Sequence, residues 1–154
     1  MPSLSDRLKE LGHTLPKPAR SVGKYAGHVV TSNQFWCVQG PVDGDDLVWQ
    51  GRVGQDYDLA EAQKCARFVM LNILKQLDLA TGGDMDRIVK AVRLGGYIWA
   101  TEDFDQHTLV MNGASELLLE VLGDRGRHAR FVVGCVSLPY KLALEIEAVF
   151  EIRA

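Results

Sequence analysis

The stretch from Gly126 to Phe150 constrains the fold more than any other part of this 154-residue chain. It contains two runs of β-branched and apolar residues, which are typical of strands, and Leu138-Pro139 separates them. Proline cannot donate a backbone hydrogen bond to a sheet, so the two runs are expected to form separate strands. Arg130 opens the first strand, and Glu145 lies within the second.

The alternation of side chains predicts where these two charges point. Residues two apart along a strand share a face. We assign the core side of both strands to one alternating apolar set: Phe131, Val133, Cys135, Leu144, Ile146 and Ala148. Arg130 and Glu145 are then expected on the outer face of neighbouring strands. Val132 and Val136 would make that face apolar, so we expect another subunit to cover it.

This stretch resembles the RidA/YjgF family of enamine and imine deaminases. In that family an arginine begins a strand, Leu-Pro follows eight residues later, and the next strand reads V/I-E-I/V-E-A. Arg130, Leu138-Pro139 and Leu-Glu-Ile-Glu-Ala at 144–148 have that spacing. Gly-Arg-His-Ala-Arg at 126–130 and the segment 7–16 are similar to the longer subgroup, which is often labelled endoribonuclease L-PSP-like.

The resemblance implies an α+β fold like that of chorismate mutase. In this fold a mixed β-sheet carries two helices on one face, and three copies form a homotrimer with clefts between subunits. The chain's own pattern of hairpin, helix, strand, helix and two strands fits the same layers. We expect residues 1–154 to form a single domain, in which residues 1–22 are an N-terminal helix and an extended arm.

Capping signals locate the helices. Ser3 is expected to cap a short helix that ends at Gly12. Asp58, with Glu61 three residues on, predicts the start of a longer helix that runs to Gly82-Gly83. A further helix is expected from Gln106 to Leu122, ending at Gly123.

Apolar runs and turn residues locate the strands. Residues 29–38 are expected to form a hairpin that turns at Ser32-Asn33. A turn at 43–46 is expected to lead into a short edge strand at 47–49. Residues 88–100 are nearly all apolar, which predicts a long strand buried on both faces, with Gly95-Gly96 as a bulge or a point of close approach.

Composition narrows the class of protein. The chain is 47% hydrophobic and 24% charged, which is typical of a compact globular domain. Its net charge of −3 gives no basic field, so no nucleic-acid partner is expected. There is no apolar run of about 18 residues and no basic-then-apolar leader, so we expect a cytoplasmic protein without a membrane partner.

Cysteines and histidines give no sign of a metal or cofactor. Cys37, Cys65 and Cys135 are an odd number at wide spacings, which fits reduced thiols. The histidines at 13, 28, 107 and 128 form no pair at metal-ligand spacing. No glycine-rich phosphate motif is present, so neither a metal nor a nucleotide cofactor is expected.

The resemblance implies roles for two charged residues. Arg130 matches the arginine that binds the substrate carboxylate, and a guanidinium can do this with two parallel hydrogen bonds. Its alternative role is an ion pair with Glu145 or Glu147. Glu145 matches the glutamate that positions or activates the attacking water. Its alternative role is a salt bridge that stabilises the trimer.

The resemblance also implies three further binding residues. Tyr25 in Gly-Lys-Tyr matches a tyrosine on the neighbouring subunit's side of the cleft, or is a packing tyrosine. Asn112 matches an asparagine at the start of the second helix, or caps the backbone. Cys37-Val38-Gln39 replaces the family's Ser-Gly-Gln, so Cys37 occupies the position of a serine near the ligand. A buried cysteine, however, more commonly acts as a small hydrophobe than as a nucleophile.

Three functions are compatible with these residues. The first is cofactor-free hydrolysis of reactive enamines or imines to 2-keto acids and ammonia, as in 2-iminobutanoate/2-iminopropanoate deaminases. The second is binding of a small carboxylate or metabolite without catalysis, which the Cys37-Val38 departure favours. The third is ribonuclease activity or translation inhibition, which the acidic balance disfavours.

Overall fold

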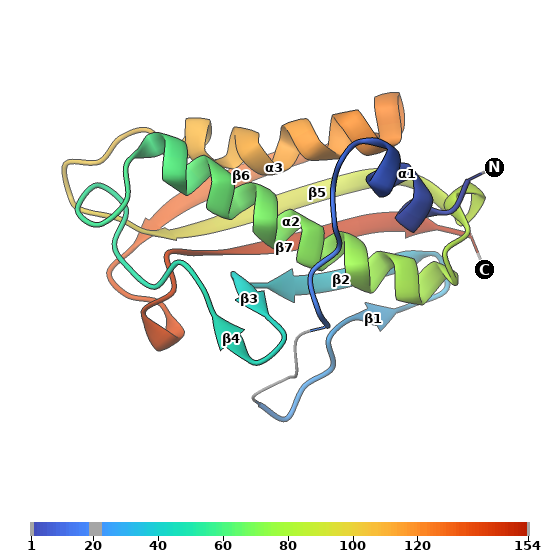
Figure 1. The fold of residues 1–154 in the computed structure, drawn as a ribbon, viewed down its shortest axis with the longest axis horizontal. Helices are drawn as coiled ribbons and strands as arrows, with labels where there is room; N and C mark the ends of the chain where they lie inside the picture. Colours follow the sequence, from blue (N-terminus) through green and yellow to red (C-terminus); the bar gives the residue numbers. More distant parts are fainter. Residues whose placement is uncertain (1, 19–22, 154) are drawn as a thin grey trace.

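A computed structural model describes residues 2–18 and 23–153. A five-stranded mixed sheet, in the order β1-β2-β7-β5-β6, carries two long helices on one face (Figure 1). The predicted α+β fold class is therefore confirmed. The elements are α1 (Leu4–Glu10), β1 (Val29–Val30), β2 (Gln34–Gln39), β3 (Val42–Asp43), β4 (Asp46–Leu47), α2 (Leu59–Thr81), η1 (Met85–Arg87), β5 (Ile88–Trp99), α3 (His107–Leu122), η2 (Gly123–Gly126), β6 (Ala129–Cys135), η3 (Pro139–Lys141) and β7 (Leu144–Ile152).

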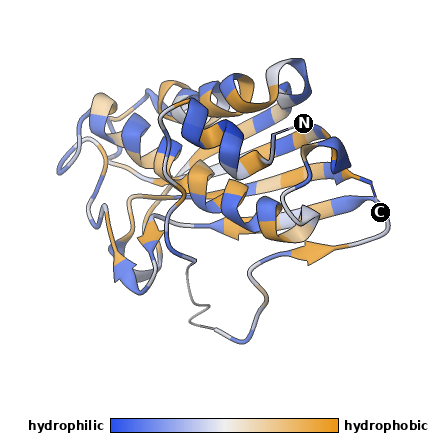
Figure 2. Cartoon of the chain, turned by 45° about the vertical axis from the view of Figure 1, so that its right-hand side comes forward, coloured by the Kyte–Doolittle hydropathy of each residue, from blue (hydrophilic) through white to orange (hydrophobic). Residues whose placement is uncertain are grey.

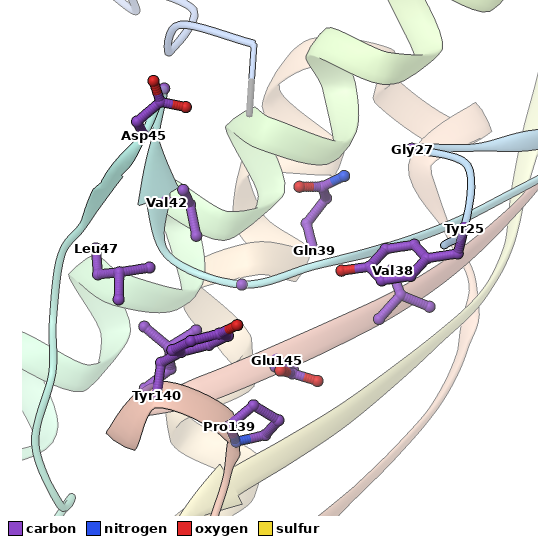
Figure 3. A pocket seen from close by; sticks show the side chains of 13 residues that line it. Tyr25, Gly27, Val38, Gln39, Val42, Asp45, Leu47, Pro139, Tyr140 and Glu145 are labelled. Carbon is purple, nitrogen blue, oxygen red and sulfur yellow. The ribbon is translucent and has the colours of Figure 1, made fainter. Parts of the chain in front are cut away.

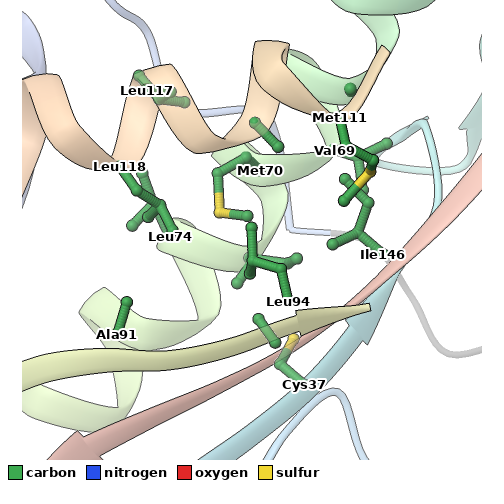
Figure 4. Close-up of a cluster of buried hydrophobic side chains, with 14 of the residues drawn as sticks. Cys37, Val69, Met70, Leu74, Ala91, Leu94, Met111, Leu117, Leu118 and Ile146 are labelled. Carbon is green, nitrogen blue, oxygen red and sulfur yellow. The ribbon is translucent and has the colours of Figure 1, made fainter. Parts of the chain in front are cut away.

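The long helices begin and end where their capping residues predict. The Asp58 side chain accepts a hydrogen bond from the backbone N–H of Glu61 at 2.9 Å, and α2 ends at Gly82 with φ of 64°. A left-handed residue at a helix end strongly favours glycine. α3 ends at Gly123. Apolar residues of both helices pack onto the sheet, where Met70, Met111 and Leu94 lie together in the core (Figure 4).

The N-terminal helix packs on the same core. The Ser3 side chain caps α1 by accepting from the N–H of Asp6, and Leu4 and Leu8 are fully buried. The Leu4 N–H also donates to the carbonyl oxygen of Gly83 at 3.1 Å. The expected extended arm includes residues 19–22, which lie outside the described residues.

The order of the strands corrects one prediction. β7 lies between β2 and β5, and β6 is an edge strand that runs parallel to β5. β6 and β7 are therefore not neighbours. The prediction rested on the tendency of consecutive strands to pair. Here both strands pair with β5, β7 along one of its edges and β6 along the other.

The faces of β6 are also the reverse of the prediction. Arg130 is in register with Leu94, which is buried beneath the helices, so Arg130 and Val132 lie on the helix side. Phe131 is in register with Gly95, which pairs with Glu147. These residues lie on the face of the sheet that the two long helices do not cover, called the bare face below. Apolar residues occupy both faces of β6, so alternation alone does not distinguish them. Val136 lies beyond the strand and is 94% exposed.

β5 differs from its prediction in two respects. Lys90 and Arg93 are exposed, so the strand is buried on its helix face and largely open on the other. The register shifts lie between residues 88 and 93 rather than at Gly95-Gly96. The alternative prediction of close approach is confirmed, because a Cβ at Gly95 would overlap the Phe131 ring and one at Gly96 would overlap Met111.

Two hairpins lie beside the cavity described below. β1 and β2 pair antiparallel as predicted. The turn at 43–46 is also confirmed, with Gly44 at φ of 64°, and it joins β3 to β4. Of the predicted edge strand at 47–49, only Leu47 lies in a strand, because β4 ends there and pairs with β3 outside the main sheet.

The bare face of the sheet presents apolar side chains. Trp36, Val38 and Val133 are between 40% and 51% exposed, and Tyr97 packs edge-on against Phe131 beside them. Figure 2 shows hydrophobic residues along both the helices and the strands of the sheet. Among the described residues, no helix is both long and apolar enough to span a bilayer.

Candidate functional site

The guanidinium of Arg130 is held against α3 by three neutral acceptors. Its Nη1 donates to Asn112 Oδ1 at 3.0 Å and to Ser115 Oγ at 2.9 Å. Its Nη2 donates to the carbonyl oxygen of Thr108 at 3.1 Å. Asn112 and Ser115 are three residues apart, so they lie on the same face of the helix. The guanidinium is therefore fixed in one plane.

His128 extends this network. Its Nδ1 lies 2.6 Å from the carbonyl oxygen of Gly126, and its Nε2 lies 2.8 Å from Ser115 Oγ. Burial lowers the pKa of His128, the hydrogen bond to Gly126 opposes this, and the charge of Arg130 lowers it further. A neutral ring that donates from Nδ1 can accept a hydrogen bond from the Ser115 hydroxyl at Nε2. Ser115 can then accept from Arg130.

Arg130 has no carboxylate partner among residues 2–18 and 23–153. The alternative of an ion pair with Glu145 or Glu147 is therefore not realised in this chain, where Glu147 pairs instead with Arg93 at 3.2 Å. Burial lowers the pKa of Arg130, but an arginine stays charged at neutral pH. The described hydrogen bonds leave Nε–H and one Nη2–H of this cation available to a planar anion.

Two other predicted residues, Tyr25 and Glu145, line a cavity of about 550 Å³ where β2 ends and β7 begins. Tyr25, Gln39 and Glu145 supply polar groups to its wall, and the β3–β4 hairpin closes one side. Figure 3 shows the hydroxyl groups of Tyr25 and Tyr140 directed toward the middle of the cavity, with the Glu145 carboxylate between the two rings in this view.

Glu145 is half-buried, and burial raises the pKa of its carboxyl group. A carboxylate with a raised pKa is a better proton acceptor near neutral pH than an ordinary glutamate.

Tyr140 lines the same cavity from an unusual backbone conformation. Its φ and ψ are 56° and 18°, and φ of Lys141 is 59°. For residues with a Cβ, the left-handed region costs roughly 1–2 kcal/mol each. Gln50 Nε2 donates to the Tyr140 carbonyl oxygen at 2.9 Å, and the Gly51 N–H donates to that of Lys141 at 2.9 Å. These bonds fix the turn, and the turn places the Tyr140 ring at the cavity.

Cys37 lies beside this region but not in the wall of the cavity. It is 4% exposed, and its Sγ donates to the carbonyl oxygen of Gly27 at 3.3 Å. Burial raises the pKa of the Cys37 thiol to about 12, whereas the hydrogen bond from Gln39 opposes this. A thiol that resists ionisation is a poor nucleophile.

The five predicted site residues thus fall into two half-sites. One half-site contains Arg130 and Asn112, and the other contains Tyr25 and Glu145 with Cys37 behind them. Arg130 pairs with Leu94 of β5, and Glu145 of β7 pairs with Tyr97, three residues further along β5. Two strand spacings across the sheet and three residues along it place the Cα atoms of Arg130 and Glu145 roughly 14 Å apart. The two side chains also point to opposite faces.

Ser115, His128, Gln39 and Tyr140 were not predicted as members of these half-sites. Ser115 follows Asn112 by one helical turn, and that spacing could have identified it. Tyr140 has no sequence signal, because the turn that positions it uses residues that do not usually adopt positive φ. Within the described residues, no group of three or more His, Cys, Asp or Glu could hold a metal ion.

These features define a class of α+β protein in which helices cover one face of a mixed sheet and polar groups form two separate half-sites. A family model described as "YjgF/chorismate mutase-like, putative endoribonuclease" matches residues 5–149. The chain therefore belongs to the YjgF/RidA family.

Relatives and solved structures agree with this assignment. Protein TCP17 of Trypanosoma cruzi is 34% identical over 149 residues, covering 95% of this chain and 92% of the relative. Protein Atu1372 of Agrobacterium tumefaciens, described as having unknown function, is 39% identical, with a TM-score of 0.87 and coverage of 97% and 92%. E. coli TdcF with bound serine is 20% identical, with a TM-score of 0.62 and coverage of 92% and 97%, and it shares the fold.

Proposed function

We propose that this protein hydrolyses reactive 2-imino acids, and the enamines that tautomerise to them, to 2-keto acids and ammonia. The observation that carries the proposal is the Arg130 guanidinium, which three neutral acceptors hold in one plane without a carboxylate partner among the described residues. Such a cation suits a planar carboxylate, which every 2-imino acid bears.

Glu145 supplies the proton transfers in this reaction. Its carboxylate takes a proton from water as the water oxygen bonds to the imine carbon, and it returns that proton to the imine nitrogen, which gives a neutral carbinolamine. The hydroxyl proton of the carbinolamine then passes through Glu145 to the amino group, the C–N bond breaks, and ammonia leaves as the C=O group forms. Water supplies the oxygen atom, so the reaction R–C(=NH)–COO⁻ + H₂O → R–C(=O)–COO⁻ + NH₃ balances without an oxidant. The raised pKa of Glu145 supports this role.

The two half-sites come together between copies of the chain. Arg130 and Glu145 point to opposite faces of one sheet, so a single copy does not direct both at one ligand. Arg130 lies on the edge strand β6, where a neighbouring copy can approach. The apolar bare face with Trp36, Val38 and Val133 supports association through the sheet. We propose a homotrimer, and light scattering should give about three times the 17.1 kDa chain mass.

The test generates 2-imino acids in place with an amino-acid oxidase and follows ammonia and 2-keto acid release. Semicarbazide traps the imine that the protein does not hydrolyse. Wild-type protein should speed release and lower trapping, and Arg130→Ala should do neither. Arg127→Ala is the matched control, because Arg127 belongs to the same segment but is exposed and pairs with Asp124. No acceleration for any amino acid in the panel would refute hydrolysis.

Binding of a small carboxylate without turnover is the second candidate. The observation that favours it is the Cys37 thiol, which replaces the family's serine and turns toward Gly27 rather than into the cavity. Calorimetry with a 2-keto acid separates the two functions, because this candidate predicts Arg130-dependent binding with no release of ammonia. Ribonuclease activity is third, since the net charge of −3 offers no basic field for RNA.

A further inference from the structure

The cavity beside Glu145 is much larger than a small imino acid requires. Its volume is about 550 Å³, within the usual range of roughly 300–1,000 Å³ for pockets that hold drug-sized ligands. The alanine-derived imino acid has only a methyl side chain, and a methyl is about the size of a water molecule, which takes up about 30 Å³. Such a ligand would leave most of the apolar wall in contact with water.

Apart from Asp45 in the turn of the β3–β4 hairpin, the part of the wall away from Glu145 is apolar. Val42 and Leu47 come from the β3–β4 hairpin, and Pro139 and Leu142 come from the turn before β7. In Figure 3 the Tyr140 ring lies opposite Val42 and Leu47, beside Pro139 of the same turn. Hydrophobic side chains at this position stabilise an apolar group of the ligand by removing it from water.

The backbone conformation of the turn at 138–142 is further evidence for a ligand site in this part of the cavity. Tyr140 and Lys141 both have positive φ, and bonds from Gln50 and Gly51 fix them. Lys141 Nζ also lies 5.3 Å from the centre of the Trp99 ring. Strained backbone that its surroundings enforce is concentrated at ligand-binding sites. Here the strain has one visible result, which is the position of the Tyr140 ring.

We infer that this cavity binds the side chain of the imino acid, that the preferred substrates carry a large apolar or aromatic side chain, and that Tyr140 determines this preference. This inference rests on the proposed function, because it places Glu145 at the imine carbon and Arg130 of a second copy at the carboxylate. The side chain then extends away from both charges, between Tyr140 and the β3–β4 hairpin.

The experiment compares pyruvate with phenylpyruvate, which share a 2-keto carboxylate and differ in the side chain. Calorimetric titration of the full-length protein gives both dissociation constants without any need for turnover. Phenylpyruvate should bind roughly 10-fold or more tightly, the selectivity that a few apolar groups provide. Tyr140→Ala should reduce the ratio of the two constants toward one, and Tyr140→Phe should preserve it. Lys90→Ala, at an exposed position of β5 outside the cavity wall, should leave the ratio unchanged.

The outcomes separate this inference from the proposed function. Equal affinity for the two acids in wild type, or an unchanged ratio in a folded Tyr140→Ala variant, would overturn the inference while leaving imine hydrolysis standing. A preference for phenylpyruvate that Tyr140→Ala removes would support it, even if the protein released no ammonia. If neither acid binds, both the carboxylate anchor and the side-chain pocket are wrong.

Discussion

Gly113 of α3 lies directly against the backbone carbonyl of Gln63 of α2. A Cβ at residue 113 would overlap the carbonyl oxygen and would lie 3.0 Å from its carbon. Both atoms belong to the main chain of a helix, so a side-chain rotation cannot relieve the overlap. The contact sets how closely the two helices approach each other above the sheet.

We therefore expect Gly113→Ala to destabilise the fold. Alanine favours helix over glycine by about 1 kcal/mol, but forcing two packed helices apart costs more, about 1–3 kcal/mol or above. The midpoint of urea denaturation should fall. Glu116→Ala, at an exposed position of the same helix, is the control and should change stability by less than about 0.5 kcal/mol. A Gly113→Ala protein as stable as wild type would show that α3 can shift freely.

Arg130→Lys and Arg130→Ala test the geometry of the carboxylate anchor. Lysine keeps the charge but loses the planar fork, and alanine loses both. We expect affinity for a 2-keto acid to fall by about one to two decades, equivalent to roughly 1.5–3 kcal/mol. The Arg130→Ala variant should bind more weakly than Arg130→Lys. Calorimetry on protein of verified oligomeric state is the measurement. Wild-type affinity in Arg130→Ala would remove this residue from the site.

Glu145→Gln should lower turnover by about 10²–10⁴-fold, the usual contribution of a general acid or base. Because the pKa of Glu145 is raised, kcat/KM of wild type should fall as the pH drops through that raised value. Glu147→Gln is the control on the same strand. It breaks the ion pair with Arg93, so stability rather than turnover should change. Equal turnover losses in both variants would argue against a specific role for Glu145.

The same shift has a consequence for stability. A carboxyl group whose folded pKa lies above its unfolded value stabilises the fold below the unfolded pKa, and this contribution is lost as pH rises through the folded value. At pH 7 the charged Glu145 carboxylate therefore destabilises the fold, and Glu145→Gln should be at least as stable as wild type. Denaturation of the two proteins at pH 7 checks this. A marked loss of stability would mean that a partner stabilises the charged form.

Cys37→Ser should retain any deaminase activity. Serine can donate the same hydrogen bond to Gly27, and the buried thiol with a pKa of about 12 is not a nucleophile at neutral pH. Thiol labelling offers a second measurement. Cys135 is partly exposed and should react first, whereas Cys37 and Cys65 should react only on unfolding. Loss of activity in a folded Cys37→Ser protein would indicate covalent chemistry instead.

Local signals in the sequence predicted the helices well and the arrangement of the last strands poorly. Asp58 and Gly82 specify the ends of α2 through chemistry that acts within a few residues. The position of β6 depends instead on contacts between distant segments. Arg130 lies on the helix side because α3 supplies three acceptors there, and neither strand pattern carries that information.

The candidate site was predicted through individual residues rather than through its geometry. Asn112 and Arg130 were both predicted, and the structure brings them within 3.0 Å of each other. That Glu145 lies on the opposite face could not be predicted, because it follows from the insertion of β5 between β6 and β7. Tyr140 requires the fold as well, since residues far along the chain, Gln50 and Gly51, fix its turn.

The neutral surroundings of Arg130 also bear on the choice of buffer. Among the described residues, this guanidinium donates only to an amide, a hydroxyl and a peptide carbonyl, so no carboxylate there excludes small anions of the solvent. Acetate, citrate and formate carry the same carboxylate group as a 2-keto acid, and phosphate binds arginine in a similar way. Each is therefore expected to act as a competitive inhibitor, so kinetics measured without carboxylate or phosphate buffers should give the lower KM.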